Sequence, residues 1–200
     1  MAADTKAERR RALLAARRAV PDEVREIEAE QLRSHLAVVV RGARTVCAYL
    51  PVGTEPGSPV LLDRLRELCE VVLLPVTRPG PDGEHLPLWW GEYKPGHLVA
   101  ARFGLREPTE PWLEPTAISG ADVVLVPALA VDRTGVRLGR GGGYYDRSLP
   151  LCTPGTRLIA VVRDGELAEA LPEESHDVRM THALIPGGGL LALGDNDRVE

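Results

Sequence analysis

A chain of 200 residues with 44% hydrophobic and 26% charged side chains predicts one globular domain with a sizeable core. Its net charge of −5 argues against general nucleic-acid binding, so an anionic ligand has to be held by local basic groups. Three cysteines without Cys-x-x-Cys spacing argue against a disulfide framework, and the sequence has neither a membrane-length apolar run nor a signal-like N-terminus. These features predict a cytoplasmic protein with no membrane or nucleic-acid partner.

The first predicted element is a strongly basic helix over residues 5–19. Within it, Lys6 and Arg10 are spaced i and i+4, which places them on the same face of the helix. Only two of the 24 basic residues are lysines, Lys6 and Lys94, so a lysine here suggests a need for a compact charge. Two interpretations stay open: the pair binds a ligand, or it lies on an ordinary solvated face of the helix. A run of charged residues more often has the second role.

Residues 45–74 alternate in the manner of a parallel α/β sheet. Residues 45–50 are a short run of β-formers, residues 58–69 have helical spacing, and residues 71–74 are a second apolar run. A helix that begins near Pro21 precedes them. Apolar strands that alternate with helices predict a parallel sheet with both faces covered.

The second half of the chain begins with residues 77–115, which are rich in proline and glycine and predict mostly irregular backbone around a strand near 86–90. Two adjacent tryptophans in that strand point to opposite faces, one toward the core and one available to line a pocket. Further strands are predicted over 121–127, 156–162 and 181–185. From about residue 187 the sequence predicts a loose tail.

A glycine-rich stretch after the 121–127 strand is the densest chemical signal. Four glycines surround Arg140 and stop at a Tyr-Tyr-Asp-Arg sequence that predicts the start of a helix; they are Gly139, Gly141, Gly142 and Gly143. Such a loop can turn its N–H groups toward an anion, and the guanidinium fork suits phosphate oxygens. The N-terminus of the following helix would face the same anion. The spacing is neither a Walker A loop nor a clean dinucleotide fingerprint, and a flexible surface loop is the alternative.

Three predicted loops carry the polar candidates: they bear Glu55, Arg140 with Asp146, and His176 with Asp177. Ligands of parallel α/β sheets bind beyond the carboxyl ends of the strands, so these loops converge if the strands are suitably ordered. Asp146 and Asp177 are candidate Mg²⁺ ligands beside a phosphate, with helix or turn capping as the alternative. His176 is a candidate acid or base. The residues alone therefore predict an α/β domain with a phosphate or nucleotide site, its chemistry open.

Residues 126–147 resemble the 5-formyltetrahydrofolate cyclo-ligase family. The resemblance continues, in the family's order, in the basic N-terminal helix, the Tyr-Leu-Pro sequence before Glu55, the stretch Phe103-Gly104-Leu105-Arg106-Glu107-Pro108, and residues 172–177. It implies a three-layer, Rossmann-like α/β sandwich with a mostly parallel central sheet. It also implies conversion of 5-formyltetrahydrofolate to 5,10-methenyltetrahydrofolate through a phosphorylated formyl oxygen, with ATP and Mg²⁺, by a protein expected to be a monomer.

The resemblance also implies roles for individual residues. Those implied are, for ATP, Lys6, Arg10, Gly139, Arg140, Gly141, Gly142, Gly143, Tyr144 and Tyr145; for the folate, Leu50, Glu55, Gly142, Gly143, Tyr144 and Tyr145; for the metal, Asp146 and Asp177; and for catalysis, Arg140 and Tyr145. Two other functions stay open on the sequence: a non-catalytic nucleotide or folate sensor on the same fold, and a phospho-sugar or CoA-transferring enzyme on a similar sheet.

Overall fold

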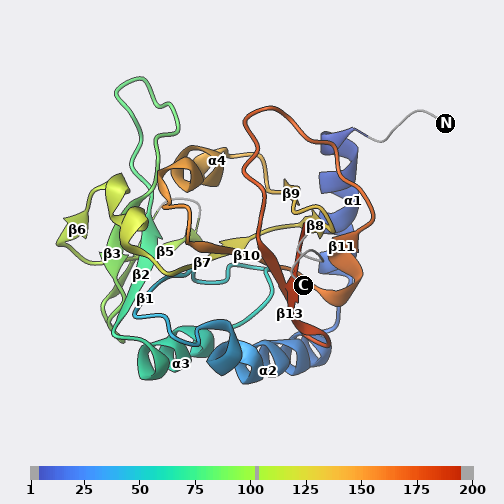
Figure 1. Cartoon of the computed structure of the whole chain (residues 1–200), viewed down its shortest axis with the longest axis horizontal. Helices are drawn as coiled ribbons and strands as arrows, with labels where there is room; N and C mark the ends of the chain where they lie inside the picture. Colours follow the sequence, from blue (N-terminus) through green and yellow to red (C-terminus); the bar gives the residue numbers. More distant parts are fainter. Residues whose placement is uncertain (1–4, 102–103, 195–200) are drawn as a thin grey trace.

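An eight-stranded sheet runs through the computed structural model, which describes residues 5–101 and 104–194. Its strand order is β13-β12-β10-β7-β1-β2-β3-β6 (Figure 1). The strands are β1 (Thr45–Cys47), β2 (Val71–Val76), β3 (Trp89–Glu92), β6 (Trp112–Leu113), β7 (Val123–Pro127), β10 (Arg157–Val161), β12 (His182–Ile185) and β13 (Gly189–Ala192). The central strands from β12 to β2 are parallel, whereas β13, β3 and β6 add antiparallel edges.

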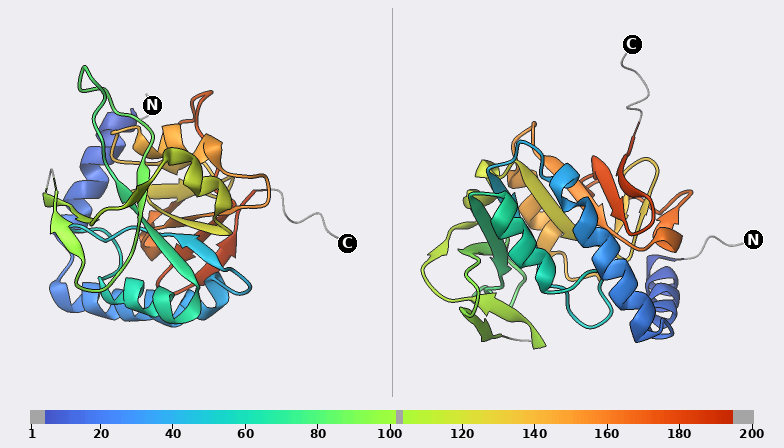
Figure 2. Two further views of the ribbon diagram at one scale, coloured as in Figure 1. Left: turned by 90° about the vertical axis from the view of Figure 1, so that its left-hand side faces the viewer. Right: turned by 90° about the horizontal axis from the view of Figure 1, so that it is seen from below.

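Helices α2 (Asp22–Val39) and α3 (Val60–Leu68) cover one face of this sheet (Figures 1 and 2). The α2 helix starts directly after Pro21, whose fixed φ suits a helix entry, and it buries Leu32, Leu36 and Val39 at helical spacing. These side chains pack against alternate residues of the strands, such as Val123 in β7. The predicted helix at Pro21 and the predicted β–α–β unit are both present.

The opposite face is covered by shorter segments: α4 (Tyr144–Ser148) and the 3₁₀ helices η2 (Pro115–Gly120) and η3 (Leu149–Leu151). The other alternate residues of β7, Val124 and Val126, join a second core on this side with Trp90 and Leu149. The sheet thus lies between two covering layers, with α4 above it and α2 and α3 below it in Figure 1. The predicted three-layer sandwich with a mostly parallel sheet is confirmed.

The basic helix α1 (Lys6–Arg18) stands at one end of the sandwich, beside a small sheet of β11 (Leu167–Ala168), β8 (Ala130–Asp132) and β9 (Arg137–Leu138) (Figure 1). Thr5 and Glu8 form a reciprocal capping box at its start, which fixes where the helix begins. Arg17 is its one fully buried residue. The structure therefore has the basic helix expected over residues 5–19, with its caps at the ends of that range.

Two expectations about the outer parts of the chain need correction. A loose tail is expected from about residue 187, but residues 189–192 form the strand β13. Leu190 and Leu191 pair with β12, and this pairing stabilises the strand despite the neighbouring glycines. The segment after residue 194 lies outside the described residues, as does Phe103. Residues 77–115 are also more ordered than expected, because β4 (Leu98–Ala100) and β5 (Arg106–Pro108) form an antiparallel pair.

Of the two adjacent tryptophans, Trp90 is fully buried in the core. The Trp89 ring lies under the guanidinium of Arg78, 4.6 Å from it, so it packs against a cation outside the main cavity. No helix among residues 5–101 and 104–194 is both long and apolar enough to cross a membrane.

Candidate active site

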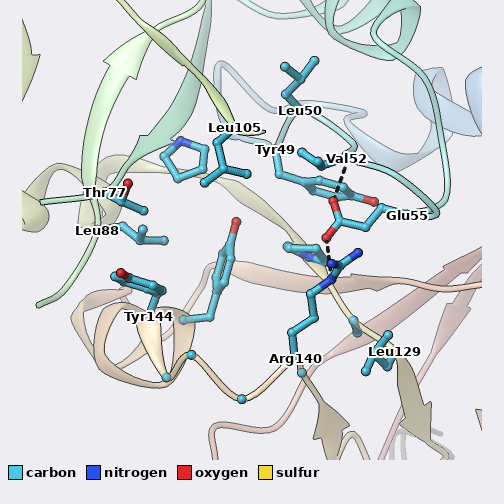
Figure 3. A pocket seen from close by; sticks show the side chains of 18 of the residues that line it. Tyr49, Leu50, Val52, Glu55, Thr77, Leu88, Leu105, Leu129, Arg140 and Tyr144 are labelled. Atoms are coloured by element: carbon cyan, nitrogen blue, oxygen red, sulfur yellow. Dashed lines mark hydrogen bonds and ion pairs between the residues drawn. The ribbon is translucent and has the colours of Figure 1, made fainter. Parts of the chain in front are cut away.

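The cavity at the centre of the molecule lies at the point where the strand order reverses. From β1 the chain moves to β2 on one side, whereas β7, β10 and β12 follow one another on the other side. In open α/β sheets ligands bind at such a switch point, beyond the carboxyl ends of the strands. A cavity of about 430 Å³ occupies this position (Figure 3). Its walls come from the loops after β1, β2 and β7 and from the glycine loop, residues 139–143.

Glu55 and Arg140, expected on converging loops, are in contact in this cavity. Arg140 Nε lies 3.2 Å from Glu55 Oε1, and the backbone N–H of Val52 donates to Glu55 Oε2 at 2.9 Å (Figure 3). Burial raises the pKa of the Glu55 carboxyl, and the effects of the Val52 N–H and of Arg140 oppose that shift. The structure therefore brings a largely buried carboxylate and a half-exposed guanidinium, from two different loops, into contact at this cavity.

The glycine loop reaches α4 through backbone conformations that favour glycine. Gly141 and Gly143 have φ angles of +97° and +70°, in the left-handed region that a side chain resists. Gly143 occupies the N-cap position, so the loop delivers Tyr144 and Tyr145 directly into the cavity wall. The predicted strand–glycine loop–helix arrangement is present, although α4 is a single turn extended by η3.

Tyr145 carries a buried hydroxyl that has no hydrogen-bond partner among the described residues. Burial raises the pKa of this phenol, so the group stays protonated and can donate. An unpaired buried hydroxyl in a cavity wall is costly unless a ligand completes its hydrogen bond. Tyr145 thus has the geometry of a ligand-contacting residue.

Arg137 is a site residue that the sequence analysis did not single out. It lies in β9, its side chain is only 8% exposed, and it forms an ion pair with Asp146. Its Nε has no hydrogen-bond partner among the described residues, and its guanidinium carbon lies 5.9 Å from the ring centre of Tyr145. Burial lowers the pKa of Arg137, whereas the charge of Asp146 raises it. A charged residue between the apolar Val136 and Leu138, next to the glycine loop, is the signal that could have identified it.

His85 is a second residue missed by the sequence analysis. Its ring stacks on Tyr144 with centroids 4.4 Å apart and an interplanar angle of 19°. Its Nδ1 lies 2.5 Å from the carbonyl oxygen of Gly142, which requires Nδ1 to carry the proton and donate. His85 therefore joins the loop after β2 to the glycine loop at the mouth of the cavity.

Lys6 and Arg10 both point from α1 toward the loops around the site. Arg10 Nε donates to the carbonyl oxygen of Gly139 at 2.9 Å, and its guanidinium lies beside Gly141. Lys6 Nζ lies 3.0 Å from Asp177 Oδ2 and 3.0 Å from Glu174 Oε2. Burial lowers the pKa of Lys6, but its bonds to the two carboxylates more than offset this, so the pKa lies above its ordinary value. Neither residue has a purely solvated position.

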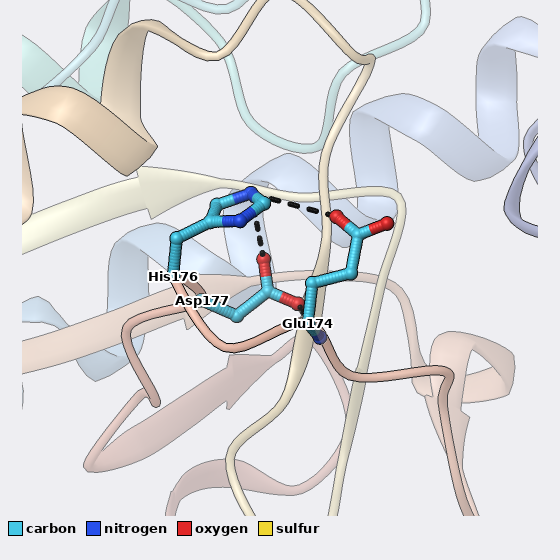
Figure 4. A group of neighbouring side chains, drawn as sticks. All are labelled: Glu174, His176 and Asp177. Atoms are coloured by element: carbon cyan, nitrogen blue, oxygen red, sulfur yellow. Dashed lines mark hydrogen bonds and ion pairs between the residues drawn. The ribbon is translucent and has the colours of Figure 1, made fainter.

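Asp177 lies against α1 and is absent from the described lining of the central cavity. With Glu174 and His176 it forms a cluster whose ligand atoms all lie within 4.8 Å of one another (Figure 4). Burial raises the pKa of Asp177, and the stronger combined effect of the Glu174 N–H and Lys6 lowers it. His176 is exposed, and its Nε2 is 3.4 Å from Glu174 Oε2. The loop that carries His176 and Asp177 therefore contacts α1 through Lys6.

The donor chemistry of the two candidate metal ligands fits Mg²⁺, a hard cation that binds carboxylate oxygens and phosphates. Asp146 lies in α4 and Asp177 in the loop before β12, yet the negative charges of both carboxylates raise the pKa of Arg137 against the effect of burial. In the structure each is paired with a basic side chain, Asp146 with Arg137 and Asp177 with Lys6. Asp146 thus lies in the cavity lining next to the glycine loop, whereas Asp177 lies against α1, and their role as metal ligands stays a prediction.

The fold and the site define an α/β protein in which a glycine-rich loop that leads into a short helix lines a cavity together with a largely buried carboxylate. A sequence model of the 5-formyltetrahydrofolate cyclo-ligase family matches residues 2–186. The chain belongs to this family, which confirms the resemblance found in residues 126–147.

Similar proteins agree with this assignment. A 5-formyltetrahydrofolate cyclo-ligase of Mycolicibacterium smegmatis is 58% identical over 193 residues, which cover 96% of this chain and 100% of the relative. One from Escherichia coli is 32% identical over 90% of this chain and 95% of its own length. Among solved structures, the 5,10-methenyltetrahydrofolate synthetase of Aquifex aeolicus has a TM-score of 0.79 and 25% identity, covering 98% of this chain and 96% of its own.

Proposed function

We propose that this chain converts 5-formyltetrahydrofolate to 5,10-methenyltetrahydrofolate in the central cavity, with ATP and Mg²⁺. Cyclo-ligase activity is that of its family and of the 58% identical relative, and the family implies use of ATP. The observation that carries the assignment to this cavity is that Glu55 and the glycine loop with Arg140 share its walls. A polar heterocycle and a phosphate can therefore be bound next to each other.

The chemistry requires an amide-like oxygen to become a leaving group. The formyl oxygen of the substrate attacks the terminal phosphorus of ATP and ADP leaves, which gives an iminium phosphate at N5. N10 then attacks the formyl carbon, loses its proton, and inorganic phosphate departs as the C–O bond breaks. Positioning and stabilisation of charge on the transferring phosphoryl group are the main tasks of the protein in such a step.

The cationic side of the cavity suits that task. Arg140 and Arg137 supply guanidinium groups that can bind phosphoryl oxygens, and residues 139–143 line the same cavity, where backbone N–H groups of a glycine-rich loop can bind an anion. Lys6 and Arg10 extend the positive charge along α1 toward the more distant phosphates. Asp146 and Asp177 would hold Mg²⁺, which neutralises phosphate charge when it is bound.

The other wall suits the folate. The Glu55 carboxylate can accept hydrogen bonds from N–H groups of the pterin, in place of its contact with Arg140. Leu50 and Tyr144 offer apolar surface to the ring system, and Tyr145 can donate its unpaired hydroxyl to the formyl or phosphoryl oxygen. In this assignment Arg140 and Tyr145 contact the reacting atoms.

The deciding experiment mixes the protein with 5-formyltetrahydrofolate and Mg·ATP and follows the absorbance of the methenyl product. We expect product only when the folate, ATP and Mg²⁺ are all present, with one phosphate released per product. Tight folate binding without product would instead support the non-catalytic sensor. A different acyl or phosphoryl product would support the third alternative. The cytoplasmic location and monomeric state expected from the sequence stay predictions.

A further inference from the structure

A second cavity adjoins the first and nothing in the reaction described above uses it. Its volume is about 440 Å³, and it shares Leu50, Val52 and Arg106 with the wall of the central cavity. The remaining residues of its described lining are Pro51, Gly53, Pro59, Tyr93, Gly96, Leu98 and Gly104. The two cavities therefore meet along one boundary, formed by the loop after β1 and the start of β5.

The lining of this second cavity has a simple chemical character. Arg106 is its one charged residue among those described, and the other side chains are apolar except for the hydroxyl of Tyr93. Arg106 donates from Nη2 to the carbonyl oxygen of Leu98 at 3.2 Å and has no ion-pair partner among the described residues. A guanidinium has five N–H donors, so most of them are available. An apolar cavity with one available guanidinium fits a ligand with an apolar body and an anionic end.

The position of this boundary matches one end of the substrate. Leu50 and Leu105 lie on the side of the central cavity opposite Arg140 and the start of α4 (Figure 3). The formyl group has to react beside the glycine loop, so the p-aminobenzoyl-glutamate part of the folate extends toward Leu50 and Arg106. That part is an aromatic amide that ends in two carboxylates.

The size of the central cavity supports the same direction. Sites for one drug-sized ligand typically measure about 300–1,000 Å³. At about 430 Å³ the central cavity lies near the lower limit, although the reaction brings together two ligands of that size. Part of the folate therefore has to leave this cavity, and the adjoining cavity offers a second volume of about 440 Å³.

We propose that the second cavity binds the benzoyl-glutamate tail of the folate, and that Arg106 pairs with a carboxylate of that tail. The inference rests on the proposed function, because it assumes that the folate ring binds beside Glu55. The hydroxyl oxygen of Tyr93, which donates its proton to Asp63 at 2.7 Å, is able to accept from the amide N–H of the tail. Arg106 then determines preference for folates that carry a glutamate.

Calorimetric titrations with two ligands test this assignment. One ligand is 5-formyltetrahydrofolate, and the other is 5-formyl-6-methyltetrahydropterin, which keeps the reacting ring but lacks the tail. Arg106→Gln is expected to weaken binding of the folate about 10-fold, as for loss of one hydrogen bond to a charged group, and to leave binding of the tail-less pterin unchanged. Arg33→Gln is the matched control, because Arg33 is partly exposed on α2, outside both cavity linings, and its ion pair among the described residues is with Glu30 of the same helix. It should change neither value.

Added salt gives a second readout, because screening weakens an exposed charge pair. The advantage of the folate over the tail-less pterin should shrink with salt in the wild-type protein and stay constant in Arg106→Gln. Equal weakening of both ligands, or an unchanged folate affinity, would overturn the tail subsite. These measurements need no turnover, so they are separate from the product assay: a protein that makes methenyl product but shows no tail dependence at Arg106 refutes only the subsite.

Discussion

At the scale of single residues, Glu55 is a carboxyl whose burial at the cavity has a cost in stability at neutral pH. Its carboxyl is 13% exposed, and burial raises its pKa against the opposing effects of the Val52 N–H and Arg140. A group whose pKa is higher in the folded state stabilises the fold while it is protonated. That contribution is present below the ordinary glutamate pKa of about 4.3 and is lost as the pH rises through the raised value.

Glu55→Gln is therefore expected to separate stability from affinity. The amide removes a desolvated charge, so the free energy of unfolding at neutral pH should rise, and urea denaturation at several pH values would show the difference growing from acid to neutral pH. The same variant should lose folate affinity more than ATP affinity, because an amide accepts hydrogen bonds from the pterin less well. Equal losses for both ligands in calorimetry would contradict the folate role.

Arg140→Ala is expected to lower kcat/KM by raising the activation free energy by about 2–4 kcal/mol. This is the usual effect of removing one donor to a developing anion. Because the side chain is half-exposed, stability should change little. Steady-state kinetics with both substrates give the measurement, and Arg133→Ala, at an exposed arginine outside the cavity lining, is the control. Near-normal kinetics for Arg140→Ala, or a similar loss in the control, would remove Arg140 from the phosphoryl site.

Candidate site residues could be predicted from the sequence where the residue type itself has a recognisable chemical role. The glycines around Arg140 and the two aspartates stood out in the sequence; the structure places the glycines and Asp146 in the lining of one cavity, and Asp177 against Lys6 of α1. His85 could not be predicted, because a single histidine in a proline-rich segment has no local signal, and its meaning comes from contacts with Gly142 and Tyr144. Arg137 was hidden for a related reason: β9 is two residues long, too short for an alternating pattern.

At the scale of elements, α1 is fixed to the sandwich by a buried ion pair. Arg17 is 1% exposed, and its Nε and Nη2 bind the two carboxylate oxygens of Glu166 at 2.7 and 2.6 Å. The same Nη2 donates to the carbonyl oxygen of Ala128 at 2.6 Å, in the loop after β7. One side chain thus joins α1 to the 3₁₀ helix η4 (Asp164–Glu166) and to the wall of the central cavity.

Arg17→Met is expected to lower the free energy of unfolding by about 3–5 kcal/mol, because it leaves the Glu166 charge buried without a partner. The double variant Arg17→Met/Glu166→Leu should recover much of that loss, since it removes both charges. Arg18→Met, at the exposed neighbouring position, is the control and should be almost neutral. Urea denaturation measures all three variants, and a double variant less stable than Arg17→Met would contradict the argument.

The helices and strands were predicted correctly where an apolar run is bounded by a residue, such as proline, that ends regular structure. The runs before Pro51 and at 71–74, with a helix between them, correctly indicated β1, α3 and β2. The prediction was wrong at β13, because glycines weaken every propensity signal and the strand exists through its pairing with β12. The small β8, β9 and β11 sheet was missed for the same reason, since its strands are stabilised by partners distant in sequence.

At the scale of the whole molecule, the site depends on the strand order, which no local pattern determines. The carboxyl ends of β1 and β7 are adjacent because the chain changes direction between them, and this brings Glu55 next to Arg140. The sequence predicted the loops and, through family resemblance, their roles. Their convergence could not be predicted from the residues, because it arises from pairings that join positions far apart in the chain.

The contact between Lys6 and Asp177 joins the first helix to the last loop before β12, and it leads to a prediction about the whole chain. The pair is partly buried, with Lys6 Nζ 3.0 Å from Asp177 Oδ2. The pKa of Asp177 is lowered and that of Lys6 is raised in the folded protein. The contribution of Asp177 to the free energy of unfolding is present above its ordinary pKa of about 3.9 and is lost as the pH falls through the lowered value. The lysine contribution is present below its ordinary pKa of about 10.4 and is lost as the pH rises through the raised value.

Lys6→Met is therefore expected to destabilise the protein throughout the neutral range, and the difference from wild type should vanish at acid pH, where Asp177 is protonated in both proteins. The same variant should raise KM for ATP more than KM for the folate, because α1 lies beside the glycine loop and the Glu55 wall is formed by other elements. Thermal denaturation against pH, together with steady-state kinetics, measures both effects. Arg11→Met, at an exposed position of the same helix, is the control for lost charge alone. A pH-independent stability loss, or an equal rise of both KM values, would show that Lys6 acts only on the packing of α1.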